Sequence, residues 1–114
     1  VKKIDLLAAI TLITVNLKPN FIIIKDGYND IKINFTDIFF IKSDKNYIDI
    51  HTLNKKISVR SSLDDFLEKL DKSTFYKVHR SYILNKTKIS EKNASSVIIN
   101  SFKIPLSRNL DFDL

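Results

Sequence analysis

The stretch FYKVHRSYILN, residues 75–85, carries the strongest structural signal in the chain. Its apolar residues alternate, which is typical of a strand or a pair of strands. A His, an Arg, a Ser and an Asn interrupt the apolar pattern, and strands that only build a core do not need them. The surrounding charge indicates what they contact, because residues 72–108 contain eight Lys or Arg and a single acid, Glu91. A polyanion is therefore the first partner to consider.

Short strand-like runs recur on both sides of this stretch and are joined by polar turns. Asp26-Gly27, which contains the only Gly of the chain, predicts a tight hairpin, and Asn93-Ala94-Ser95-Ser96 predicts another turn. The expected strands span residues 21–25, 28–34, 38–41, 47–53, 56–60, 75–78, 81–84, 87–90, 97–100 and 102–106. Because strands and helices do not alternate, we expect a mainly β fold of small antiparallel sheets.

The period of the apolar residues changes once. Apolar residues from Leu63 to Leu70 follow helical spacing and share one face, so we expect a short helix there. Ser62 precedes it and can cap its N-terminus. The exposed side of this helix is acidic, with Asp64, Asp65, Glu68 and Asp71.

Composition argues against catalytic chemistry. The 114 residues include no Cys, one Gly and two His, and the net charge is +6. Thiolate or His-based metal sites and glycine-rich phosphate loops are therefore not expected. Ser81, His79 and Asp49 could be assembled into a triad, but Ser81 and His79 are two residues apart on an extended run and have no reason to meet as nucleophile and base. We expect no enzyme, no cofactor and no small-molecule substrate.

The N-terminal segment differs from the rest of the chain. The sequence has no Met, so we expect it to be part of a longer protein. The apolar run Leu6–Val15 is far shorter than the roughly 20 residues of a membrane helix, and Asn16-Leu17-Lys18-Pro19 is a poor signal-peptide cleavage site. We expect residues 1–19 to form a connector or N-terminal extension from a missing upstream region, and residues 20–114 to form one domain.

If the partner is DNA, the residue types indicate how it is read. Arg and Asn can each make two hydrogen bonds to one base edge in the major groove, Arg to guanine and Asn to adenine. Lys supplies phosphate contacts that carry no sequence information. The sequence contains no zinc-finger or helix-turn-helix pattern, and DNA would repel the acidic helix. Any reading of DNA is therefore expected from turns and strand ends.

The order of several motifs resembles the LytTR family of bacterial DNA-binding domains. The stretch 75–85 is close to the family signature F-x-R-V-H-R-S-Y-I-V-N. Other landmarks follow the family order: Asp37-Ile38-Phe39-Phe40-Ile41 for its DI-x-aromatic-I strand, Asn46-Tyr47-Ile48 for N-Y-V, Ser62-Leu63 and Leu70 for its SL…L helix, and Ile104-Pro105-Leu106-Ser107-Arg108 for I-P-V-S-R. The likeness extends from about Phe21 to Asn109, which is most of the chain.

The resemblance implies three small antiparallel sheets arranged in line with one short α-helix, and turns inserted into the major groove, commonly by two copies on direct repeats. It implies base contacts for Lys45, Asn46, Arg80 and Arg108. It implies contacts to the DNA backbone for Lys42, Lys77, Ser81 and Lys86. His79 and Asn85 stay open between packing and contact. Asp111 and Asp113 stand where the family has basic residues, so we expect weaker binding at that end.

The sequence thus predicts a sequence-specific DNA-binding domain of a bacterial transcriptional regulator, located in the cytoplasm. We expect it to be the output half of a two-component response regulator, with double-stranded DNA and an upstream receiver or sensory domain as partners. The alternative is a protein-interaction or membrane-associated sensory module with the same fold and no tight DNA binding, which the apolar run Leu6–Val15 suggests.

Overall fold

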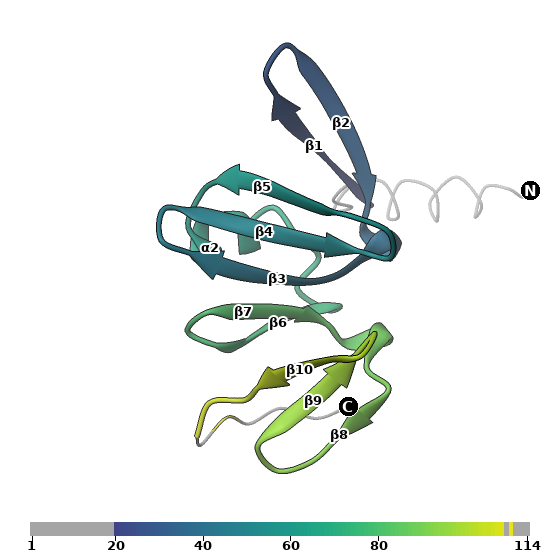
Figure 1. Cartoon of the computed structure of the whole chain (residues 1–114), viewed down its shortest axis with the longest axis vertical. Coiled ribbons are helices and arrows are strands. Elements are labelled where there is room, and N and C mark those ends of the chain that lie inside the picture. The colour runs from purple at the N-terminus through teal and green to yellow at the C-terminus, as the bar shows by residue number, and fades with distance from the viewer. Residues whose placement is uncertain (1–19, 109, 111–114) are drawn as a thin grey trace, which may run out of the picture.

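The computed structural model describes residues 20–108 and 110, and these form three antiparallel sheets (Figure 1). The expected extension at residues 1–19 lies outside the described residues. The first sheet is a hairpin of β1 (Phe21–Asp26) and β2 (Asn29–Asn34). Gly27 in its turn has a φ of +67°, a left-handed conformation that favours glycine. The predicted Asp26-Gly27 hairpin is therefore confirmed.

The second, central sheet has five strands in the order β5-β4-β3-β7-β6. They are β3 (Ile38–Asp44), β4 (Tyr47–Thr52), β5 (Lys56–Arg60), β6 (Phe75–His79) and β7 (Tyr82–Asn85). Strand alternation gives the sheet two different faces. Ile48 and Ile50 are fully buried on the face that we call the inner face. Asp49 and His51 alternate with them on the opposite, outward face.

Helix α2 (Leu63–Leu67) packs on the inner face. The Oγ of Ser62 accepts a hydrogen bond from the backbone N–H of Asp65 at 3.1 Å, so the predicted cap is confirmed. The helix is shorter than the predicted span of residues 63–70, because its last turn tightens: the N–H of Leu70 donates to the carbonyl of Leu67, three residues back, at 3.0 Å. Leu70 is nevertheless fully buried, as its place on the apolar face required.

The third sheet has the order β10-β9-β8 and consists of β8 (Glu91–Lys92), β9 (Ser96–Ile99) and β10 (Phe102–Pro105). The strand predicted at residues 87–90 is wrong, because the 3₁₀ helix η2 (Lys86–Lys88) occupies the first half of that segment and its second half forms no strand. Asn85 causes the change: its side-chain oxygen accepts from the N–H of Thr87 at 2.9 Å and curls the chain. Regular pairing resumes only at β8.

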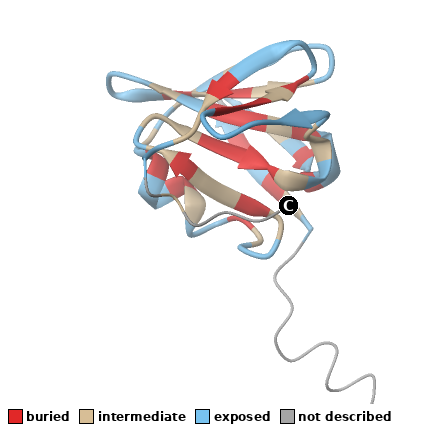
Figure 2. Ribbon diagram, turned by 90° about the horizontal axis from the view of Figure 1, so that it is seen from below, coloured by how far each residue is buried: buried red, intermediate tan, exposed pale blue. Residues whose placement is uncertain are grey.

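Two hydrophobic clusters hold the sheets together. The first joins the β1–β2 hairpin and α2 to the inner face, where Phe35 of η1 (Phe35–Asp37) meets Phe75 edge-on with 5.6 Å between ring centroids. The second joins the third sheet to the outward face around Phe40, Val78 and Ile104. Figure 2 shows buried positions along the strands and exposed positions at the turns. The fold is thus mainly β with one short helix, as predicted. Its turns connect strands that pack on the two hydrophobic clusters.

Candidate nucleic-acid interface

Three connections lie at one edge of the molecule: the β3–β4 turn, the β6–β7 turn and the segment that follows β10 (Figure 1). Strand pairing explains the first two, because Lys42 of β3 lies opposite both Asp49 of β4 and Tyr82 of β7. The turn after Lys42 and the turn before Tyr82 are therefore neighbours. We call this edge the turn edge and define it by Lys45, Asn46, Arg60, Arg80, Ser81 and Arg108.

The β3–β4 turn presents Lys45 and Asn46, and both are exposed. Lys45 has a φ of +60°, the left-handed conformation that few residues other than glycine adopt. The carbonyl of Asn46 accepts a hydrogen bond from the N–H of Ser61 at 3.2 Å. This bond ties the turn to the end of β5, so the two side chains project from a fixed position.

The β6–β7 turn presents Arg80, which is exposed. The carbonyl of Ser81 accepts from the N–H of Ser43 at 2.9 Å, which ties the turn to β3. Within the turn, the N–H of Ser81 donates to Nδ1 of His79 at 3.1 Å. Arg80 forms no ion pair with any other residue that the structure describes. Among these residues, no carboxylate competes with an outside partner for its guanidinium.

The segment after β10 joins the same edge through one backbone contact. The N–H of Ser107 donates to the carbonyl of Val78 at 2.8 Å, which fixes the chain beside the end of β6. Arg108, the next residue, is exposed. The structure thus brings together the four residues for which base contacts were expected.

Arg60 also belongs to the turn edge, although the sequence pattern indicates only that it ends a strand. It lies opposite Tyr47 in the β4–β5 pair. Together with Lys45, Asn46 and the two serines that follow it, Arg60 lines a shallow depression of about 420 Å³. Alternation along residues 56–60 was the available signal, since it places Arg60 on the same face as Lys56 and Ser58.

Comparisons with known proteins show the family of the chain. The model of the LytTr DNA-binding domain matches residues 28–111, which is most of the chain. The chain belongs to the LytTR family of DNA-binding domains. Over 79 residues it is 33% identical to the sensory transduction protein LytT of Enterococcus faecalis, a match that covers 64% of this chain and 33% of that protein. The chain therefore spans about a third of the length of this relative.

A solved structure shares the fold. A LytTr DNA-binding domain from Bacillus cereus superimposes with a TM-score of 0.65 at 20% sequence identity, covering 78% of this chain and 87% of that chain. The expected LytTR architecture of small antiparallel sheets and one short helix is therefore confirmed.

Two lysines for which backbone contacts were expected lie away from the turn edge of this LytTR domain. Lys77 lies opposite Ile83 and points to the inner face, where its Nζ forms an ion pair with the carboxylate of Asp64 at 2.7 Å. Lys86 follows the far end of β7, and its amine lies 3.4 Å from the hydroxyl of Tyr76. Neither residue adds its charge to the turn edge.

Asn85 lies in the core and not at the surface. It is 1% exposed, and its amide donates to the carbonyls of Ile38 at 2.9 Å and Phe35 at 3.4 Å. Its oxygen caps η2 through Thr87. These bonds use its amide internally, so we assign it a structural role. His79 is half-buried and uses Nδ1 within the turn, which leaves Nε2 for an outside partner.

The outward face continues from the turn edge through Lys42, whose Nζ lies 5.9 Å from the centroid of the Tyr82 ring. Beside it, His51 stacks on Phe40 with 4.2 Å between ring centroids. Burial lowers the pKa of His51 from its ordinary value of 6.5; Asp49 opposes this shift, and Lys56 and Lys42 add to it. His51 is therefore neutral near pH 7.

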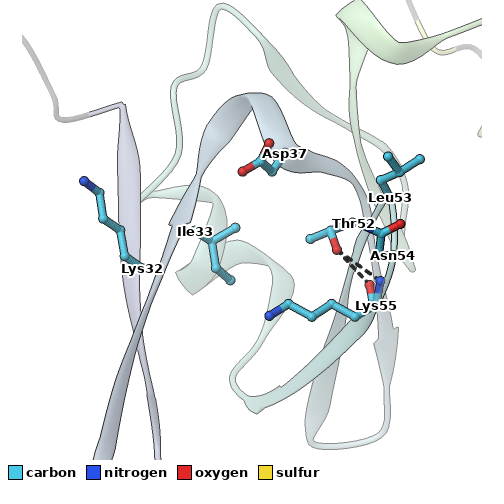
Figure 3. Close-up of a pocket in the computed structure, with 7 residues that line it drawn as sticks. All are labelled: Lys32, Ile33, Asp37, Thr52, Leu53, Asn54 and Lys55. Atoms are coloured by element: carbon cyan, nitrogen blue, oxygen red, sulfur yellow. Dashed lines mark hydrogen bonds between the residues drawn. The ribbon is translucent and has the colours of Figure 1, made fainter.

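A separate hollow of about 450 Å³ lies at the opposite side, between β2 and the β4–β5 turn (Figure 3). The hydroxyl of Thr52 closes this turn by donating to the carbonyl of Lys55 at 3.0 Å. The residues that line it include Lys32, Asp37 and the exposed Leu53. Across the described part of the chain, no three His, Cys, Asp or Glu gather to hold a metal ion, and no helix is long and apolar enough to cross a membrane.

Proposed function

We propose that this LytTR domain binds double-stranded DNA sequence-specifically and reads the major groove with the turn edge. The observation that carries the proposal is the grouping of Lys45, Asn46, Arg60 and Arg80 at neighbouring strand ends. Backbone hydrogen bonds at Asn46 and Ser81 fix the turns against adjacent strands. Such support matters, because side chains that read bases must be held in position before binding.

The residue types support a division of labour along the edge. Arg80 and Asn46 can each form two hydrogen bonds to one base, Arg80 to guanine and Asn46 to adenine. Lys45 and Arg60 flank them and suit phosphate contacts that set the register of the domain on the duplex. Arg108 extends the same edge toward the third sheet as a further candidate base contact.

The distribution of charge supports one orientation on DNA. Asp65 lies exposed on α2, over the inner face, where its carboxylate would repel phosphates. The cations of the turn edge have no carboxylate partner among the residues that the structure describes. DNA is therefore attracted to the turn edge and kept from the helix.

We further propose that the domain is the output half of a bacterial response regulator with an upstream receiver or sensory domain. The support is that it corresponds to about a third of the length of LytT, a sensory transduction protein. One turn edge offers few base-reading side chains, so binding by two copies on direct repeats would read a longer site. The apolar run Leu6–Val15, which suggested a membrane-associated module, lies outside the described residues.

In vitro selection from random duplexes tests the proposal. We expect a recovered consensus and binding that weakens with salt. Arg80→Ala should cost about 1–3 kcal/mol on the selected site. Lys69→Ala, which removes an exposed cation beside α2, is the matched control and should leave base preference intact. A purely protein-interacting module would recover no consensus, and that result would overturn the proposal.

A further inference from the structure

A groove lies at the seam between the central and third sheets, and its positively charged side chains are not among those that define the turn edge. Three lysines line it, Lys42 from β3, Lys56 from β5 and Lys103 from β10, and His51 lines it as well. We call it the seam groove. Its volume is about 190 Å³. That is below the roughly 300–1,000 Å³ of pockets for drug-sized ligands, so its occupant is a small group.

The seam groove adjoins the turn edge. Lys42 lies two residues before Asp44, the last residue of β3, and a strand advances about 3.3 Å per residue. The groove wall is therefore roughly 7 Å from the β3–β4 turn. Tyr82, another wall residue, directly follows the β6–β7 turn. A duplex held at the turn edge brings its backbone close to this groove.

The charge of the groove is positive at neutral pH. None of its lysines forms an ion pair with another described residue. Asp49, the one acid on the wall, accepts a hydrogen bond from the hydroxyl of Ser58 at 2.6 Å. His51 is neutral near pH 7, since its burial lowers its pKa. Three ammonium groups against one carboxylate leave a net charge that favours an anion.

We propose that the seam groove seats one backbone phosphate of the DNA that the turn edge reads. This inference rests on the proposed function. Lysines act on phosphate as point charges and carry no sequence information. All three lysine side chains sit on an open wall, which gives weak affinity for a free anion. DNA bound at the turn edge has a high effective concentration of backbone phosphate near the groove. A site with weak intrinsic affinity is therefore occupied in the complex.

Phosphate neutralisation along the selected duplex tests the seat. Each phosphate in turn is replaced by an uncharged methylphosphonate, and affinity is measured for the native chain and for the variant Lys42→Gln, Lys56→Gln, Lys103→Gln. We expect one position where neutralisation weakens native binding about fivefold but weakens the variant less than about twofold. The variant should also flatten the plot of log affinity against log salt by about 0.9, the value for one phosphate.

The matched control is Lys25→Gln, Lys32→Gln, Lys69→Gln, which removes the same charge from exposed positions outside the groove. It should keep the fivefold response at the same phosphate. A variant with the three groove lysines changed to arginine should keep it as well, which separates loss of charge from loss of fold. If the groove and control variants respond alike at every phosphate, the seat does not exist.

The remaining outcomes separate this inference from the proposed function. If Arg80→Ala still relaxes base preference while no phosphate couples to the groove lysines, only the seat is overturned. A titration with inorganic phosphate at constant ionic strength tests whether the groove binds a free anion instead of a DNA phosphate. NMR signals of the His51 ring report the binding. Saturation below about 1 mM would assign the groove to a free anion and overturn its assignment to DNA. We expect no saturation in that range.

Discussion

The two ends of the β6–β7 hairpin, both within the stretch 75–85, place a polar residue in opposite environments. At the turn, Arg80 is exposed and makes no ion pair with the described residues. At the far end, Asn85 is buried and its amide bonds two carbonyls of the η1 region. Two polar residues in one apolar run thus lie in opposite environments, and we propose recognition for the exposed one and a structural role for the buried one. The difference shows that a polar residue within an apolar strand has a specific role, but its presence alone does not distinguish a structural role from a binding role.

The largest expected effect comes from the buried end. Asn85→Ala should lower the free energy of unfolding by about 2–3 kcal/mol, because it removes the amide that donates to the carbonyls of Ile38 and Phe35 and leaves η2 without its cap. Arg80→Ala, at the exposed end, should change stability by less than about 0.5 kcal/mol. Urea denaturation of both variants makes the comparison. Equal stability of the two variants would remove the distinction between the ends.

The second largest effect on stability is expected at the cap of the helix on the inner face. Ser62→Ala removes the side-chain acceptor at the N-terminus of α2 and should cost about 1 kcal/mol of stability. Ser62→Asn, which can also cap, should recover most of the loss. Urea denaturation measures the loss, and equal stability of Ser62→Ala and the native chain would contradict the assignment of Ser62 as the cap.

Removing one cation from the turn edge, Arg60, and one from the inner face, Lys77, compares the contributions of the two surfaces to DNA binding. Arg60→Ala should flatten the salt dependence of DNA binding by about 0.9, as expected for one lost phosphate contact. Lys77→Ala should leave this slope unchanged, because Lys77 pairs with Asp64. Affinity measured across a salt series distinguishes them. A flatter slope for Lys77→Ala alone would reverse our assignment.

The smallest expected effect concerns pH. The folded state disfavours protonated His51, whose pKa is lowered by burial, while the unfolded chain takes up the proton near the ordinary value of 6.5. The contribution of His51 to stability is therefore complete above about pH 6.5 and decreases as the pH falls below it. His51→Phe keeps a ring against Phe40 and removes the titration. Its stability should fall less between about pH 7 and pH 5.5 than that of the native chain.

Local patterns predicted the elements, whereas long-range pairing determined the site. The strand predicted at residues 47–53 and the cap at Ser62 follow from neighbours in sequence, and the structure contains both. Arg60 reaches Asn46 only because β5 pairs with β4, and Lys77 meets Asp64 across 13 residues. The burial of Asn85 likewise depends on carbonyls 47 and 50 residues away. Such contacts leave no periodic trace in the sequence, so residue type alone could not separate contact residues from structural ones.

The most direct test of the account is a base-substitution scan of the selected duplex with the native chain and with Arg80→Ala. If Arg80 reads a base from the turn edge, the native chain will lose about 1–3 kcal/mol of binding free energy at one base pair, and Arg80→Ala will lose almost nothing there. Discrimination at the other positions will be retained. An identical specificity profile for both proteins would contradict the claim that the turn edge reads DNA.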